Sequence, residues 1–131
     1  MALFDRLAVY REQGLAALRI MTGLLFLEHG TMKLFAFPVP QGDGGPLSTL
    51  MLFAALLEFV GGILITIGFL TRPVAFILSG QMAVAYFMAH APGSFWPAVN
   101  KGEAAILFSF VFIYLFFAGA GAFSVDNRKK I

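Results

Sequence analysis

Four apolar stretches separated by short polar connections take up most of the chain, and each contains an ionisable or amide side chain. The stretches run over residues 15–36, 47–70, 73–91 and 102–123, each close to the roughly 20 residues that a bilayer-spanning α-helix needs. A charge at the centre of such a helix costs about 2.5–3.5 kcal/mol to insert. The pattern therefore predicts an integral membrane protein whose polar groups face protein, water or a ligand.

Composition supports this class and excludes several others. Hydrophobic residues make up 60% of the 131 residues and charged residues only 12%, so we expect a single transmembrane domain over residues 1–131. The sequence contains no cysteine, which excludes disulfides, thiolate metal sites and thiol redox relays within the chain. The net charge of +2 comes from basic residues near helix ends, so we expect a lipid bilayer rather than a nucleic acid as the partner.

The connections predict how the helices are joined. Prolines and glycines interrupt the helices at residues 38–46 and 92–97, and the connection at 71–73 leaves room only for a tight reversal. Short connections make neighbouring helices antiparallel, so we expect an all-α, up-down-up-down bundle of four transmembrane helices. Residues 2–13 separate apolar from polar side chains and predict a short interfacial helix that ends at a bend near Gly14.

Basic residues near the helix ends predict the orientation, because cytoplasmic loops carry an excess of lysine and arginine. Lys33 and Lys101 would lie on the outer side. The opposite side would hold a larger set: Arg6, Arg11, Arg72, Arg128, Lys129 and Lys130. We therefore expect both termini in the cytoplasm.

The polar residues of the first two spans share narrow faces. A spacing of four, three, four and three residues places Arg19, Gly23, Phe26, Gly30 and Lys33 on one stripe, with Glu28 pointing away from it. On the second span, Glu58 lies near the bilayer midplane, among small residues at 54, 55, 61 and 62. If the two faces meet, Arg19 and Glu58 are natural partners.

Further polar residues fall at the outer ends of the spans. His29, His90 and Glu103 lie at a similar level, and Gln81 lies at a depth similar to that of Glu58. A polar funnel that opens outward above Glu58 would follow if these ends converge. The candidate binding residues are Arg19, His29, Lys33, Glu58, Gln81, His90 and Glu103.

Several interpretations of this set stay open. Arg19 and Glu58 could form a buried ion pair that only fixes helix register. The cluster could instead bind a quinone, whose carbonyl oxygens need donors such as Arg19, Lys33, Gln81 or a histidine. A metal site built from His29, His90, Glu28 and Glu103 is chemically permissible, but the Glu-x-x-His spacing of di-iron bundles is absent. We predict no metal and no nucleotide cofactor.

The combination of motifs resembles one known family. The matching positions are Arg19, Gly23, His29, Gly30, Lys33, the segments EFVGG at 58–62 and GFLTR at 68–72, His90, Glu103 and GAGAFSVD at 119–126. Over nearly all of its length the chain resembles the DoxX family of small bacterial membrane proteins. The resemblance implies a four-helix protein of the inner membrane related to the membrane subunits of thiosulfate:quinone oxidoreductase. Glu28 and Val125 depart from the expected pattern.

From the residues and the resemblance together, we expect a quinone-interacting or accessory subunit of a membrane redox system, without a self-contained catalytic motif. Redox partner proteins or further copies of the chain would be its partners. One alternative is a structural or assembly protein of the membrane, in which the charges serve only helix register. A second is a transporter of protons or small solutes, which would need oligomers or a dedicated proton path.

Overall fold

The computed structural model describes residues 2–128, and this part of the chain forms helices joined by turns, with no strand. The long elements are α2 (Arg11–Phe35), α3 (Thr49–Ile67), α4 (Thr71–Ala85) and α6 (Glu103–Ala118). The short ones are α1 (Ala2–Asp5), η1 (Arg6–Tyr10), η2 (Tyr86–His90), η3 (Ala91–Gly93) and α5 (Pro97–Asn100). The all-α class predicted from the sequence is confirmed.

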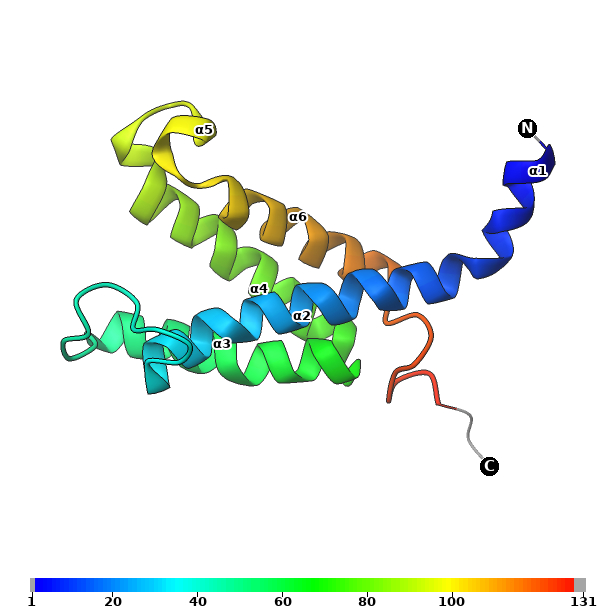
Figure 1. Ribbon diagram of the computed structural model, residues 1–131, viewed down its shortest axis with the longest axis horizontal. Helices are drawn as coiled ribbons and strands as arrows, with labels where there is room; N and C mark the ends of the chain where they lie inside the picture. Colours follow the sequence, from blue (N-terminus) through cyan, green and yellow to red (C-terminus); the bar gives the residue numbers. More distant parts are fainter. Residues whose placement is uncertain (1, 129–131) are drawn as a thin grey trace.

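The long helices are arranged as two antiparallel pairs (Figure 1). Helix α2 packs mainly on α3, and α4 packs mainly on α6, while contacts between the pairs are fewer. The pairs spread apart where the α2–α3 connection and α5 lie, which we call the loop end. Helix α1 and the segment after α6 lie at the opposite end, the terminal end. The cavity described below lies between the two pairs at the loop end.

Glycines set the distance between α2 and α3. A Cβ atom at Gly23 would lie 2.8 Å from the backbone nitrogen of Thr66, and one at Gly30 would lie 2.7 Å from the backbone nitrogen of Phe59. On the facing helix, a Cβ atom at Gly62 would lie 2.8 Å from the Cα atom of Leu27. The two backbones therefore pack directly on each other, as small residues allow in membrane helices.

The predicted stripe on α2 is confirmed as a buried face. Arg19, Gly23, Phe26 and Gly30 are buried, and the Lys33 side chain is only 8% exposed. Phe26 also connects the two helix pairs, because its ring lies edge-on to the rings of two phenylalanines of α6, Phe108 and Phe112, with centroids 5.4 and 4.9 Å away. Edge-to-face aromatic pairs of this kind add to the energy of apolar burial.

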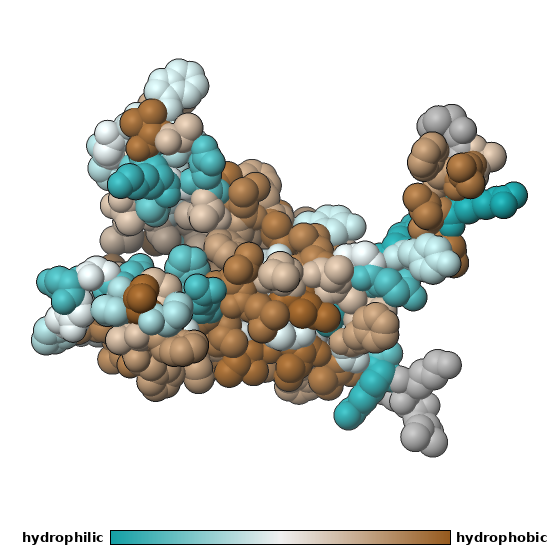
Figure 2. Space-filling view, viewed as in Figure 1, coloured by the Kyte–Doolittle hydropathy of each residue, from teal (hydrophilic) through white to brown (hydrophobic). Residues whose placement is uncertain are grey.

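Two helical segments are long and apolar enough to cross a membrane: Thr49–Ile67 and the continuous run Thr71–Gly93. Helix α6 is apolar but only 16 residues long, about 24 Å. Helix α2 is 25 residues long but carries several charged residues. Figure 2 shows an apolar middle of the molecule between polar residues at its two ends. The four-span topology stays a prediction.

Several predicted boundaries are wrong. The span expected over 102–123 ends at Ala118, because Gly119 and Gly121 adopt positive φ angles of 85° and 73° that turn the chain back on itself. The bend expected at Gly14 is absent, since α2 begins at Arg11. Residues 2–10 are helical and exposed, and their place at the membrane surface stays a prediction. Lys129 and Lys130, used to predict orientation, lie outside the described residues.

Candidate ligand-binding cavity

A cavity of about 740 Å³ lies between the two helix pairs at the loop end. Apolar side chains from α2, α3, α4 and α6 form most of its wall, including Phe26, Leu57, Ile77, Met82 and Phe108. In Figure 2 the two lobes of the molecule separate at this end. A volume in this range fits a small molecule or the head group of a lipid-soluble ligand.

The polar residues of the wall include most of the set predicted from the sequence. His29, Lys33, Glu58, Gln81 and His90 all line the cavity, joined by Gln41 and Lys101 near its mouth. Two predicted members are not part of the wall: Arg19 lies near the terminal end, and Glu103 is exposed at the start of α6. The structure thus gathers five of the seven predicted residues.

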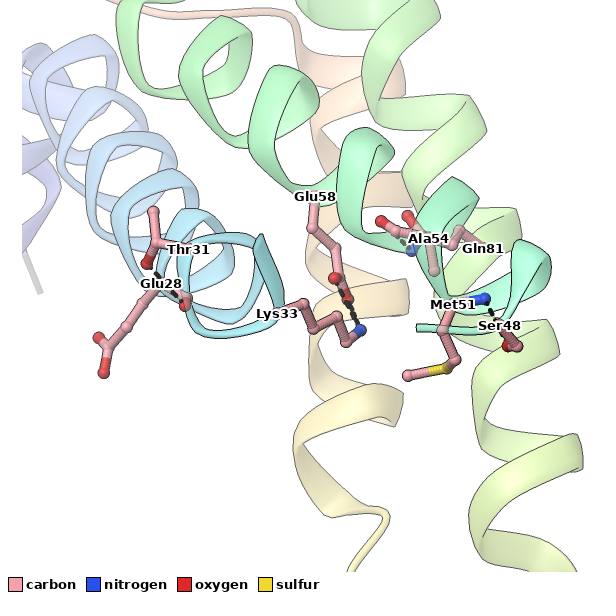
Figure 3. A network of polar contacts seen from close by, with 8 residues as sticks. All are labelled: Glu28, Thr31, Lys33, Ser48, Met51, Ala54, Glu58 and Gln81. Carbon is pink, nitrogen blue, oxygen red and sulfur yellow. Dashed lines mark hydrogen bonds and ion pairs between the residues drawn. The ribbon is translucent and has the colours of Figure 1, made fainter. Parts of the chain in front are cut away.

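An ion pair between Lys33 and Glu58 forms part of the cavity wall (Figure 3). The Lys33 Nζ atom donates to both carboxylate oxygens of Glu58, at 2.8 and 2.7 Å, and the two side chains are 8% and 4% exposed. An ammonium group has three N–H donors, so one remains after this two-pronged contact. The pair is neutral as a unit, which allows both charges to remain inside an apolar region.

Local structure explains why this pair forms. Lys33 is in the last turn of α2, where the exposed carbonyl groups favour a cation. Gly30, one turn earlier, lets the α2 backbone approach α3 at Glu58. A Cβ atom at Gly30 would lie only 3.0 Å from the Glu58 carbonyl carbon. Glu28 points away from the pair and is exposed, as expected (Figure 3).

The Gln81 amide lies on the α4 side of the cavity. Its Nε2 atom donates to the backbone carbonyl of Ala54 on α3, at 3.4 Å, while its Oε1 atom is buried and has no hydrogen-bond partner among the described residues. The opposite amide orientation would place two oxygens against each other, so the carbonyl of Ala54 fixes the assignment. The Gln81 Oε1 atom is therefore a buried hydrogen-bond acceptor without a partner among the described residues.

The sequence reading missed the arrangement around His90. Residues Tyr86–His90 form a π-helical turn that continues α4, a feature often found at functional sites. The His90 Nδ1 atom lies 3.1 Å from the backbone oxygen of Asn100. The Asn100 amide donates to the Tyr86 hydroxyl at 3.1 Å and to the Ser94 backbone carbonyl at 3.0 Å, and it accepts from the Gly102 N–H at 2.8 Å. Asn100 thus fixes the loop beside the cavity.

His29 lies in a simpler environment. Its ring is edge-on to that of Phe108, with centroids 5.9 Å apart, and no hydrogen bond joins it to the rest of residues 2–128. The metal site considered from the sequence would have needed both histidines with Glu28 and Glu103. Both glutamates are exposed, and no group of three histidine or acidic side chains in the described part of the chain could hold a metal ion.

The predicted pairing of Arg19 with Glu58 is wrong. Gly23 faces Thr66, Leu27 faces Gly62 and Gly30 faces Phe59, and this register places Arg19 opposite the end of α3. Arg19 instead donates from Nε to the carbonyl of Ile65 at 3.0 Å, about two helical turns beyond Glu58. The helix faces were predicted correctly, whereas the register between the helices was not.

Arg19 is fully buried and holds the segment that follows α6. Its guanidinium group donates to the backbone carbonyls of Ala120, Ala122 and Phe123, the last two at 3.0 and 2.8 Å. Gly68, at the end of α3, leaves the space for this arrangement, because a Cβ atom there would lie 3.1 Å from Arg19 Cζ. Arg19 therefore has a structural role, and it is not one of the residues that line the cavity.

Asp126 completes this end of the molecule. Its carboxylate accepts hydrogen bonds from the backbone N–H groups of Leu70 and Thr71, both at 2.9 Å, at the start of α4. Partial burial would raise the pKa of Asp126, but the hydrogen bonds from Thr71 and Leu70 and the charge of Arg19 outweigh it, so the pKa lies below its usual value. Asp126 therefore caps α4 in its ionised form.

The fold is all-helical over the described residues, and two of its segments are long and apolar enough to cross a membrane. A model of the DoxX family matches residues 14–91, which include the Lys33–Glu58 pair, and the chain belongs to this family. An uncharacterized protein of Haemophilus influenzae is 43% identical over 129 residues, covering 95% of this chain and 96% of that protein. Inner membrane protein YqjF of Escherichia coli is 31% identical over 127 residues, covering 90% and 95%. No solved structure matches the chain.

Proposed function

We propose that this protein crosses the bacterial inner membrane four times and binds a quinone in the cavity at the loop end, as an accessory subunit of a membrane redox system. The observation that carries the proposal is the cavity itself, an apolar chamber of about 740 Å³ with a buried Lys33–Glu58 pair in its wall. The family membership and the name of the Escherichia coli relative support the inner membrane as its location.

The surfaces of the long helices support the four-span topology. The outward face of α2 exposes Leu18, Met21, Leu24 and Leu25, which water would not favour but lipid would. Helix α6 exposes Leu107, Phe110, Tyr114 and Phe117 in the same way. The first described residues and the segment after α6 lie at one end of the molecule (Figure 1), which agrees with an even number of crossings and with both termini in the cytoplasm.

The chemistry of the cavity fits a quinone. The aromatic and aliphatic wall suits a flat ring with an isoprenoid tail, and the cavity between the helix pairs is only partly enclosed. The free N–H of Lys33 can donate to a carbonyl oxygen of the ring. The neutral Lys33–Glu58 pair, rather than a single charge, suits a ligand without charge.

Binding of a short-chain 1,4-benzoquinone to the purified protein in lipid nanodiscs tests the proposal. Ala104 lines the cavity and is exposed, so Ala104→Trp should fill the space and weaken binding at least about tenfold. Ala98, on α5, is also exposed but does not line the cavity, so Ala98→Trp is the matched control and should leave binding unchanged. No saturable binding to the unmodified protein, or equal binding to both variants, would contradict the proposal.

The two alternative functions stay predictions with their own tests. An assembly protein would keep its partners in the membrane when the cavity is filled by Ala104→Trp. A transporter would show flux of protons or solute in proteoliposomes that depends on Glu58. A redox subunit would co-purify with quinone and would show no flux that depends on Glu58.

A further inference from the structure

The cavity wall contains hydrogen-bond acceptors that have no donor among the described residues. His90 is the clearest case. Since the backbone oxygen of Asn100 can only accept, His90 Nδ1 must carry the hydrogen of the 3.1 Å contact. In the neutral ring, Nε2 then has a lone pair and no hydrogen. No residue in the described range 2–128 donates to this Nε2 atom, and His90 is only partly buried and lines the cavity.

A second acceptor group lies in the same wall. Among the described residues the Glu58 carboxylate accepts only from Lys33, so lone pairs remain on both oxygens. The Gln81 Oε1 atom has no partner in the described part of the chain either, but it is buried. The unused donors of the wall include the third N–H of Lys33, the second N–H of the Gln81 amide, whose first donates to Ala54, and the ring N–H of His29. Lys101, near the mouth, is exposed and therefore hydrated.

The two redox forms of a quinone differ in the hydrogen bonds that they can make. The oxidised ring has two carbonyl oxygens, which accept and never donate. The reduced ring has two hydroxyl groups, each of which donates and also accepts. A carbonyl oxygen beside His90 Nε2 or the Glu58 carboxylate would place two lone pairs together, whereas a hydroxyl group would make a hydrogen bond at either position.

We propose that the cavity binds the dihydroxylated, reduced head group more tightly than the oxidised quinone, with the Nε2 atom of His90 accepting one of its hydroxyl hydrogens. This inference rests on the quinone-binding function proposed above. Asn100 is a positioning residue in this scheme: its backbone carbonyl fixes the tautomer of His90, and its side chain holds the loop through Tyr86, Ser94 and Gly102. Lys33 and Glu58 complete the site, one as donor and the other as acceptor.

One net hydrogen bond corresponds to about a tenfold change in affinity. We therefore expect the hydroquinone to bind about tenfold more tightly than the quinone. By linkage, a tenfold preference raises the midpoint potential of the bound two-electron couple by about 30 mV relative to the free couple. The dimethyl ether of the hydroquinone, which has the same ring but no hydroxyl donor, should bind no better than the quinone.

The experiment measures dissociation constants of a short-chain benzoquinone, its hydroquinone and the dimethyl ether for the full chain in lipid nanodiscs without oxygen. His90→Phe removes the acceptor and should bring the hydroquinone preference close to one. His90→Gln retains a donor and an acceptor, should restore part of the preference, and guards against a loss of folding in the first variant. Ala98→Trp is the control, because Ala98 is exposed and does not line the cavity, and it should retain the full preference.

The outcomes separate this inference from the function on which it rests. Equal affinities for hydroquinone and quinone in the unmodified protein, or an unchanged preference in His90→Phe, would overturn the inference and leave quinone binding in place. Absence of binding by all three compounds would overturn both. A preference that disappears in His90→Phe, returns partly in His90→Gln and persists in Ala98→Trp would establish the role of His90.

Discussion

The protein buries charge in two places, and the two differ in their partners. Near the terminal end, Arg19 is fully buried and donates to four backbone carbonyls, from α3 and from the segment after α6. Near the loop end, Lys33 and Glu58 are almost as deeply buried, but they contact each other and border a cavity. Burial is similar at both places. The partners and the adjoining space distinguish a charge that holds the fold from one that can meet a ligand.

Removal of Arg19 should have the largest effect. Arg19→Met leaves up to three partly or fully buried carbonyls without a donor, those of Ala120, Ala122 and Phe123, since Ile65 keeps the N–H of Gly68; at about 1–3 kcal/mol each, we expect a loss on the order of 5 kcal/mol or a failure to accumulate in the membrane. Thermal unfolding in detergent measures this loss. Arg19→Lys keeps the charge but not the planar fork of donors, and it should recover only part of the stability. If Arg19→Met unfolded at the same temperature as the unmodified protein, Arg19 would not hold the fold, and the contrast with the Lys33–Glu58 pair would be lost.

The Lys33–Glu58 pair should respond differently to single and double changes. Lys33→Met leaves Glu58 without its cation and should cost about 3 kcal/mol, less than the loss of Arg19, because water in the cavity can reach the carboxylate. Replacing both charges, in Lys33→Met with Glu58→Leu, should return the stability to within about 1 kcal/mol of the unmodified protein. The double variant should nevertheless lose quinone affinity. A double variant as unstable as the single one, or one that binds quinone normally, would show that the pair is a structural element like Arg19.

Asp126 should give the smallest effect and a distinct dependence on pH. Asp126→Asn weakens the cap of α4 and should cost about 1 kcal/mol at neutral pH. Because folding lowers the pKa of this carboxyl, its contribution is complete above the unfolded pKa of about 3.9 and is lost as the pH falls through the lower folded value. Unfolding measured from pH 7 to pH 3 should therefore show the two proteins converging below about pH 4.

Asp43→Asn is the control for this pH series, since Asp43 is exposed in the α2–α3 connection and bonds only to the nearby Gly45 N–H among the described residues. It should follow the unmodified protein at every pH. A constant difference between the unmodified protein and Asp126→Asn over the whole series would contradict the ionised cap.

Sequence reasoning identified the buried faces but not the register between them. The spacing of Arg19, Gly23, Phe26, Gly30 and Lys33 fixes one helical face, because helical geometry is local. Which residue of α3 lies opposite each of them depends on backbone contacts at the glycines, and no periodic pattern specifies that choice. Arg19 and Glu58 were therefore matched by charge, whereas the structure matches Lys33 with Glu58.

The site residues show the same difference between what local helix geometry predicts and what depends on contacts between segments. Helix depth alone predicted His29 and His90 at the same level and Gln81 at the depth of Glu58, and all of these residues line the cavity. The partnership of His90 with Asn100 could not be predicted, because it joins a ring nitrogen to a backbone oxygen across a turn. The segment after Ala118 was expected to be helical, so its free carbonyls were not available as partners for Arg19. Glycines at 119 and 121 were the signal that could have indicated the turn.

The attachment of the last segment to Arg19 has a consequence for biosynthesis. Arg19 leaves the ribosome 101 residues before Ala120, the nearest in sequence of its C-terminal partners. During insertion its guanidinium must therefore remain with water, lipid phosphate or the insertion machinery, and the terminal end closes only after residues 120–123 have been made. A chain interrupted before Gly119 would carry an unsatisfied cation into the membrane, a lesion that quality-control proteases of the membrane can recognise.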